Sequence, residues 1–339
     1  MRAFAGSLLF TLAALLAAAA YGWGTTGSIA ATAGLVWIVI VLAVLEISLS
    51  FDNAVVNAAV LKDMDPVWQS RFLTWGMLIA VFGMRVVFPL VIVALAAGLG
   101  PVAATVLSLT DPVRYEAIVS SAHGAISGFG GAFLLLVGLD YFLDRTKTVH
   151  WIGWIEAPLV ALASVRSAAI ALVLALLLII AHSLPGPDAL VFVDAGLGGI
   201  IAHIAVEAIG TALEAREQAR RFAGALVRSG LGGFIYLNVL DASFSFDGVI
   251  GAFALSNNMV IIALGLSIGA LFVRSITLML VRSGTLEQYR YLEHGAYWAI
   301  IALGAIMLAS VQIAVPETVT GLIGAILIAL SLWASWREL

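Results

Sequence analysis

Two short strings of acidic and hydroxyl residues lie inside apolar stretches of this chain, and they are the residues best suited to chemistry. The first covers residues 46–53, with the sequence EISLSFDN, and the second covers residues 241–248, with the sequence DASFSFDG. Both contain an acid, then two serines, a phenylalanine and an aspartate at the same spacing. A carboxylate within a membrane segment is costly unless it is paired, and such groups usually mark a functional site. The repetition therefore predicts that the two strings build one polar site.

The strings offer four carboxylates as candidate ligands of a divalent cation: Glu46, Asp52, Asp241 and Asp247. The polar neighbours that we expect to support them are Ser48, Ser50, Ser243, Ser245, Asn57 and Asn238. Such hard oxygen ligands suit Mg²⁺, Ca²⁺ or Mn²⁺ rather than copper or zinc. Two arginines that also fall within apolar stretches, Arg85 and Arg274, are candidate counter-ions.

The balance of these charges allows two interpretations. Four carboxylates and two arginines leave a negative excess that one divalent cation would neutralise. Alternatively, the arginines pair with two of the acids, and the other two acids stay protonated and relay protons. Passage of a metal ion and passage of protons can also occur together.

Helical periodicity places the polar residues of the first string on two faces. At 100° per residue, one stripe contains Glu46, Ser50, Asn53 and Asn57, and Asp52 lies with Ser48 about 200° away. A straight helix therefore cannot direct Glu46 and Asp52 at one point. We expect either a break near residues 48–52 or polar neighbours on two sides of the helix, and the same holds for the second string. Discontinuous helices are common at the sites of transporters.

Four other polar residues within the apolar stretches are candidates for a proton relay. His203 and Glu207 are four residues apart, so one helix face holds both. They could relay protons, form a second metal site, or make an ordinary hydrogen bond between helices. His123 and His294 each open an apolar stretch and are followed by Gly-Ala. These two histidines could take part in proton transfer, or they could simply anchor their helices at the membrane interface.

The composition indicates the environment of these residues. Of 339 residues, 63% are hydrophobic and 11% are charged, against about 25% charged residues in a soluble domain. The chain is therefore expected to be an all-α polytopic membrane protein whose partners are the lipid bilayer and a metal-ion substrate. A net charge of −4 argues against nucleic-acid binding, and the absence of cysteine excludes disulfides and thiolate chemistry. We expect no prosthetic group, and a homo-oligomer is compatible with the sequence.

The apolar stretches predict about ten membrane spans, since a span needs roughly 20 apolar residues. The expected spans are 3–21, 33–60, 73–99, 117–142, 168–184, 189–212, 231–255, 258–281, 295–314 and 317–334. The first is interpreted as a retained anchor in preference to a signal peptide, whose cleavage would leave nine spans. The segment 145–166, rich in tryptophan and basic residues, is expected to lie at the interface.

The basic residues orient the spans. With the N-terminus inside, 13 of the 16 basic residues fall in cytoplasmic segments, Arg114 falls outside, and Arg85 and Arg274 fall within spans. Cytoplasmic loops of membrane proteins carry such an excess of Lys and Arg. Both termini are therefore expected to be cytoplasmic if the first span is retained.

Three successive spans in each half share a marker, which indicates an internal repeat. The acidic strings mark spans two and seven, Arg85 and Arg274 mark spans three and eight, and His123 and His294 mark spans four and nine. An offset of five spans is odd, so the halves must insert with opposite orientations, as in many secondary transporters. The expected organisation is an N-terminal span in 1–30, repeat halves in 31–144 and 230–314, a connecting unit in 145–229 and a last span in 315–339.

The two acidic strings, together with Gly83-Met84-Arg85, resemble the TerC-like family of bacterial integral membrane proteins. The resemblance covers residues 35–315 and implies a LysE-type exporter of the bacterial inner membrane, associated with tellurium resistance and manganese export. By matching position it implies an ion site formed by Glu46, Asp52, Asn53, Asp241 and Asp247. The chain departs from the pattern at Gly248, which stands where the first string has Asn53, and at Asn238, where an acid is expected.

These observations favour a transporter that exports a divalent cation through a site at the membrane midplane. Mn²⁺ is the first choice of ion, with Mg²⁺ and Ca²⁺ as alternatives. Proton coupling is plausible because carboxylates must lose protons to bind metal. One alternative is an exporter of an amino acid or another small cation, whose site Phe51 and Phe246 could line. Another is a scaffold protein of the metal or tellurite stress response. The enzyme motifs that we sought are absent, so no enzymatic activity is expected.

Overall fold

In the computed structural model, helices joined by short turns account for most of the residues that the structure describes. These are residues 4–76, 78–144, 149–162, 167–222, 230–253, 255–256, 258–313 and 315–338, and no β-strand occurs among them. The helices are α1 (Ala5–Thr26), α2 (Ile29–Leu49), α3 (Phe51–Leu61), α4 (Pro66–Arg71), η2 (Phe72–Gly76), η3 (Ile79–Val87), α5 (Phe88–Ala96), α6 (Pro101–Thr110), α7 (Pro112–Ser121), α8 (His123–Phe142), α9 (Gly153–Leu162), α10 (Ala168–Ala181), α11 (Gly186–Phe222), α12 (Leu231–Phe253), α13 (Met259–Ser283), α14 (Thr285–Gln288), α15 (Leu292–Ala309) and α16 (Glu317–Trp336).

The all-α polytopic bundle expected from the sequence is confirmed. Within the described ranges, eight helical stretches are long and apolar enough to cross a membrane. Every expected span has a helical counterpart, but the fifth is shorter than this length, and the seventh is only partly covered by the residues whose side chains the structure describes. The fifth corresponds to the 14 residues of α10, and the seventh to α12, whose described apolar part is Leu231–Ala242. Large apolar side chains lie exposed on the long apolar helices, for example Leu9 on α1 and Trp37 on α2, as a lipid-facing surface requires.

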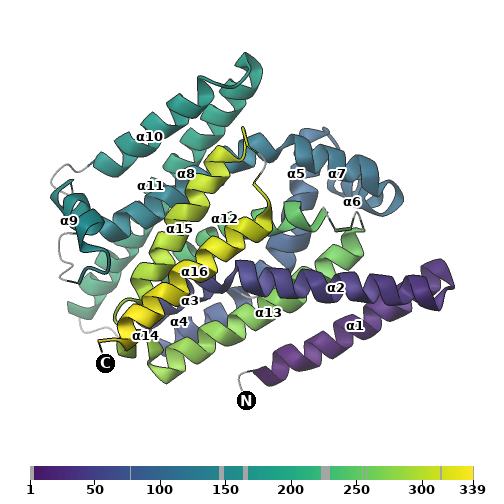
Figure 1. The fold of residues 1–339 in the computed structure, drawn as a ribbon, viewed down its shortest axis with the longest axis horizontal. Helices are drawn as coiled ribbons and strands as arrows, with labels where there is room; N and C mark the ends of the chain where they lie inside the picture. The colour runs from purple at the N-terminus through teal and green to yellow at the C-terminus, as the bar shows by residue number, and fades with distance from the viewer. Residues whose placement is uncertain are drawn as a thin grey trace.

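Helices α3 and α12, which carry parts of the two polar strings, lie in the middle of the view in Figure 1. The hairpin of α1 and α2 lies at one side of the view, and α10 with α11 lies at the opposite side. Ser7 fastens α1 to the bundle, because its hydroxyl bonds to Leu271 O at 2.8 Å and to the Ser275 hydroxyl at 2.7 Å. In the segment expected at the interface, α9 is too short to span a membrane, and Trp154 is exposed.

Helices of the two expected repeat halves pack on one another in related pairs. The second span of the first half, α2, runs along α13, and its counterpart α12 contacts η3, which is the counterpart of α13. The marked helices α8 and α15 also pack together. An inverted repeat with an axis through the bundle would produce these exchanged contacts. The inverted orientation itself stays a prediction.

Glycines allow the helices to approach closely, as small residues do at interfaces between membrane helices. A Cβ atom on Gly199 of α11 would lie 2.2 Å from the carbonyl oxygen of Phe129 on α8. On the other side of α8, a Cβ on Gly131 would lie 2.7 Å from the Leu308 side chain of α15. The helix α8 is therefore held between two neighbours at close range.

The second expected span is broken within residues 48–52, which is one of the two arrangements expected from the polar residues. Helix α2 ends at Leu49, Ser50 leaves helical geometry with φ −103° and ψ 17°, and α3 begins at Phe51. The third span is irregular in another way, because η2 and η3 are π-helical. Stretches of π-helix often occur at functional sites, and η3 carries Arg85.

Substitution of Gly269 by alanine is expected to destabilise the protein by about 1–3 kcal/mol, the usual cost of overpacking. The new Cβ would lie 2.4 Å from Cβ and Cγ of Glu46, so α2 and α13 would have to separate. Gly34, on α2, is the matched control: a Cβ there meets no atom within 4 Å, and G34A should be neutral or mildly stabilising. Thermal unfolding of the purified variants in detergent measures both effects. Equal stability of G269A and G34A would contradict the close packing.

Candidate ion site at the centre of the bundle

A buried ion pair joins the second and third spans. The Glu46 carboxylate, in the last turn of α2, pairs with the Arg85 guanidinium of η3, and both side chains are buried. The Ser50 hydroxyl donates a hydrogen bond of 3.0 Å to Glu46 Oε1 from the break between α2 and α3. The break therefore supplies a hydroxyl donor to the carboxylate, while the π-helical η3 supplies its counter-charge.

Asp241, the first acid of the second string, lies near the ion pair of Glu46 and Arg85. Asp241 of α12 is buried, and its Oδ1 accepts a hydrogen bond of 2.9 Å from Asn57 Nδ2 of α3. Asn53 also bonds to this carboxylate, and Arg85 and Glu46 lie close enough to act on its charge. Residues 184 positions apart in the chain thus meet at one point. We call the set Glu46, Ser50, Asn53, Asn57, Arg85 and Asp241 the central cluster.

Two amide oxygens of the central cluster remain without partners. Asn53 and Asn57 are buried, and the side-chain oxygen of each has no hydrogen-bond partner among the described residues. A buried acceptor without a donor is costly, and such groups in native proteins call for an explanation. Carbonyl oxygens are ligands of hard cations. With two acids against one arginine, the central cluster combines a formal excess of negative charge with two amide oxygens that have no partner among the described residues.

Asp52 lies on a different side of α3 from the central cluster. Its carboxylate is buried, Oδ1 accepts a bond of 2.9 Å from the Asn53 N–H, and Oδ2 lies near Gly324 of α16. A Cβ built on Gly324 would be 3.7 Å from that oxygen. The expectation that one helix cannot direct Glu46 and Asp52 at the same point agrees with this placement. No hydrogen bond between Asp52 and Asp241 occurs among the described residues, and the two acids have different partners.

Several residues expected at the site have other surroundings. Ser48 is exposed and donates to Val44 O at 2.8 Å, and Asn238 donates to Phe234 O at 2.7 Å, so both bond to their own helix. Arg274 makes no ion pair within the described part of the chain, and its Nε has no partner there. Ser243, Ser245 and Asp247 lie on the helical backbone of α12, but their side chains lie outside the described residues.

A cavity of about 380 Å³ opens between the end of α3 and the starts of α12 and α15. Lys62 and Glu293 form an ion pair there, and the cavity also borders Tyr297. On α3 its lining includes Ala59, which follows Asn57 by less than one helical turn. The lining thus begins within one helical turn of Asn57 along α3, although it includes no residue of the central cluster. In the topology expected from the basic residues, all three helix ends are cytoplasmic.

The two histidines that open α8 and α15 lie in separate networks. His123 is near the hydroxyls of Ser127 and Ser310, at 3.3 and 3.5 Å. His294 bonds to Val149 O at 2.9 Å and lies 3.8 Å from Glu156. These hydrogen bonds and ion pairs lead to other residues than those of the central cluster. Their place in a proton relay stays a prediction.

Glu156 is a buried carboxylate that the sequence analysis did not single out. It accepts bonds from the backbone N–H groups of Trp151 and Ile152, at 2.9 and 3.2 Å, and from Trp298 Nε1 at 3.0 Å. Two histidines, His150 and His294, lie within 3.8 Å. These bonds fasten the segment around α9 to α15. The signal in the sequence was an acid within an otherwise apolar run, which is also the pattern of an interfacial segment.

A second polar group brings Asp140 of α8 to His203 and Glu207 of α11. The His203 ring nitrogen Nε2 and Asp140 Oδ2 are 2.6 Å apart. The sequence indicates the pairing of His203 with Glu207 on one helix face, whereas the place of Asp140 near the end of an apolar stretch is typical of a solvated acid. Only the packing of α8 against α11 brings it to the histidine.

Comparison with known proteins yields one family match. The family model described as "Protein of unknown function (DUF475)" matches residues 51–338. The matched range includes all of the central cluster except Glu46 and Ser50, which directly precede it. No curated protein and no solved structure matches the chain.

Proposed function

The chain belongs to the DUF475 family of proteins of unknown function, and we propose that it is a membrane transporter that exports a divalent cation, with Mn²⁺ as the first choice. The helical bundle with several apolar helices long enough to cross a bilayer makes it a multi-pass membrane protein. Membrane proteins of this kind rarely carry charged groups at their centre without a function that uses them.

The observation that carries this proposal is the composition of the central cluster. It gathers two buried carboxylates, two buried amide oxygens without partners among the described residues, and one arginine. These are hard oxygen ligands, and their charge is negative before a cation arrives. A cluster built only for stability would satisfy its amide oxygens, whereas a site that awaits an ion leaves them open. A proton pathway alone would need the carboxylates but not the two amide oxygens.

In the proposed mechanism, Arg85 holds Glu46 ionised while the site is empty. An arriving cation binds Asp241 and the oxygens of Asn53 and Asn57, and it competes with Arg85 for Glu46. Any proton held by a carboxylate must leave before the metal binds, so metal passage is coupled to proton release. Relative movement of the two repeat halves would then expose the site to the other side of the membrane.

The cavity beside α3 provides the access that the mechanism requires. It would connect the cytoplasm with Asn57 if the expected topology holds, and Lys62 and Glu293 would close or open its mouth. Its volume of about 380 Å³ exceeds that of a bare ion, so a hydrated ion or a small organic cation could enter. The resemblance to TerC-like proteins favours Mn²⁺, export and the bacterial inner membrane.

Transport of Mn²⁺ by the purified protein in proteoliposomes tests the proposal. We expect saturable Mn²⁺ flux that lysine and arginine do not inhibit and that a pH gradient modulates. In parallel assays, the inhibition of Mn²⁺ flux by an excess of Mg²⁺ or Ca²⁺ shows how strongly each ion competes for the site. Flux of cationic amino acids without flux of Mn²⁺ would instead identify an amino-acid exporter. Absence of flux for every solute, with the protein folded, would contradict transport and favour a scaffold.

A further inference from the structure

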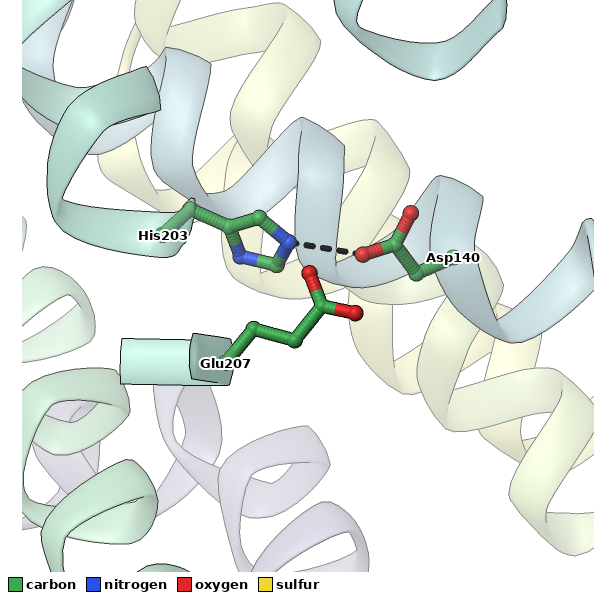
Figure 2. A group of neighbouring side chains, drawn as sticks. All are labelled: Asp140, His203 and Glu207. Carbon is green, nitrogen blue, oxygen red and sulfur yellow. Dashed lines mark hydrogen bonds and ion pairs between the residues drawn. The ribbon is translucent and has the colours of Figure 1, made fainter. Parts of the chain in front are cut away.

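Three potential metal ligands converge between α8 and α11, away from the central cluster (Figure 2). Asp140, His203 and Glu207 each offer one ligand atom, and the three atoms lie within 4.8 Å of one another. Figure 2 shows the two carboxyl groups directed toward the same side of the imidazole ring. We call these three residues the His203 cluster. It shares no residue with the central cluster, so the inference below does not rest on the proposed function.

The three residues of the His203 cluster differ in how far they are buried. His203 is only 6% exposed and packs against the edge of Phe133, with the ring centres 5.6 Å apart. The Asp140 side chain is 47% exposed, and Glu207 is exposed as well. A fixed imidazole with two accessible carboxylates allows an ion to enter without rearrangement of the helices. In the expected topology, the cluster lies near the cytoplasmic ends of its two spans.

The charges of the His203 cluster are not balanced by the protein. Two carboxylates face one histidine, and no Lys or Arg forms an ion pair with Asp140 or Glu207 within the described part of the chain. The other ring nitrogen, Nδ1, is buried without a hydrogen-bond partner among the described residues. A histidine that served only to join two helices would need a single carboxylate. No hydrogen bond or ion pair to the second carboxylate, Glu207, occurs within the described part of the chain, and this carboxylate adds repulsion unless a cation joins the group.

We propose that Asp140, His203 and Glu207 form a binding site for a divalent transition-metal ion. One imidazole and two carboxylates are ligands that zinc, manganese, iron and cobalt accept. Three protein ligands leave further coordination positions for water, so the bound ion can exchange. On binding, the proton shared by His203 Nε2 and Asp140 leaves to solvent, and the metal takes its place.

Nitrogen coordination distinguishes this site from the central cluster, whose candidate ligands are all oxygen atoms. We would titrate chelator-treated protein in detergent with Mn²⁺ and record the coupling of the bound ion to ¹⁴N by pulsed electron paramagnetic resonance. The expected result is a signal from one directly bound imidazole, which persists in Asp241→Asn. The variant His203→Gln should lose the signal, and His182→Gln, at an exposed histidine, should keep it.

A second variant protects the test against misfolding of His203→Gln. Glu207 is exposed, so Glu207→Gln should fold normally, and it should weaken the nitrogen-coupled site by at least about tenfold, the lower range for changes around a metal. Absence of nitrogen coupling in the unaltered protein would overturn the proposal. Unchanged affinity in Glu207→Gln would also overturn it. Because the readout is binding rather than flux, failure of transport leaves the test intact.

Discussion

Replacement of Asp241 by asparagine is expected to lower Mn²⁺ flux in proteoliposomes by at least about a hundredfold. Changes to the outer-shell partners of metal ligands already cost roughly 10–100-fold in affinity or activity. Asp241 is expected to bind the ion directly, and its loss removes one of the two negative charges of the central cluster. The substitution keeps the size of the side chain and its oxygen acceptor for Asn57. The expected loss therefore reflects charge rather than packing.

The control for this prediction is Asp188→Asn, at an exposed acid in the first turn of α11. It makes the same chemical change away from the central cluster and should leave flux unchanged. Thermal unfolding of both variants checks that they are folded to the same extent. Normal Mn²⁺ flux in a folded Asp241→Asn variant would remove Asp241 from the transport site.

Helical periodicity predicts local features of the residues around the central cluster. Different faces for Glu46 and Asp52 follow from the helical repeat, and a break near Ser50 is one of the two arrangements that this placement allows. The fold class follows from composition and span length. These features are local, so the order of residues along one helix determines them.

Contacts between helices could not be predicted in the same way. The bond between Asn57 and Asp241 joins residues far apart in the chain, and it depends on how α3 and α12 cross. The repeat made the two arginines look equivalent, yet Arg85 pairs with Glu46 while Arg274 forms no ion pair among the described residues. An internal repeat predicts similar positions for two residues but not identical neighbours, because side chains around each copy differ.

Asp140 illustrates the same limit for the His203 cluster. Its position near a span end indicates a solvated acid, and its side chain is indeed half exposed. The glycines that let α8 and α11 approach each other also decide that Asp140 meets His203. When two helices each contribute part of a site, the sequence shows the residues of each helix but not that they meet.

Removal of the Arg85 charge is expected to destabilise the protein strongly. In Arg85→Met, Glu46 would remain buried without its counter-ion, a change that typically costs 3–5 kcal/mol, to order of magnitude. The Ser50 hydroxyl alone cannot replace a full positive charge. The measurement is reversible unfolding in mixed micelles, followed by tryptophan fluorescence. Arg282→Met, at an exposed arginine in the last turn of α13, is the matched control and should unfold like the unaltered protein.

The double variant Glu46→Gln with Arg85→Met distinguishes the effect of the lost charge from the effect of altered packing. A buried pair replaced on both sides leaves no unpaired charge, so much of the lost stability should return. The same double variant should still fail to transport Mn²⁺, because the proposed mechanism needs the Glu46 carboxylate as a ligand. Recovery of stability without recovery of flux would show that the charges are retained for transport rather than for folding. Equal destabilisation of the single and double variants would instead assign the role of Arg85 to packing along the π-helical η3.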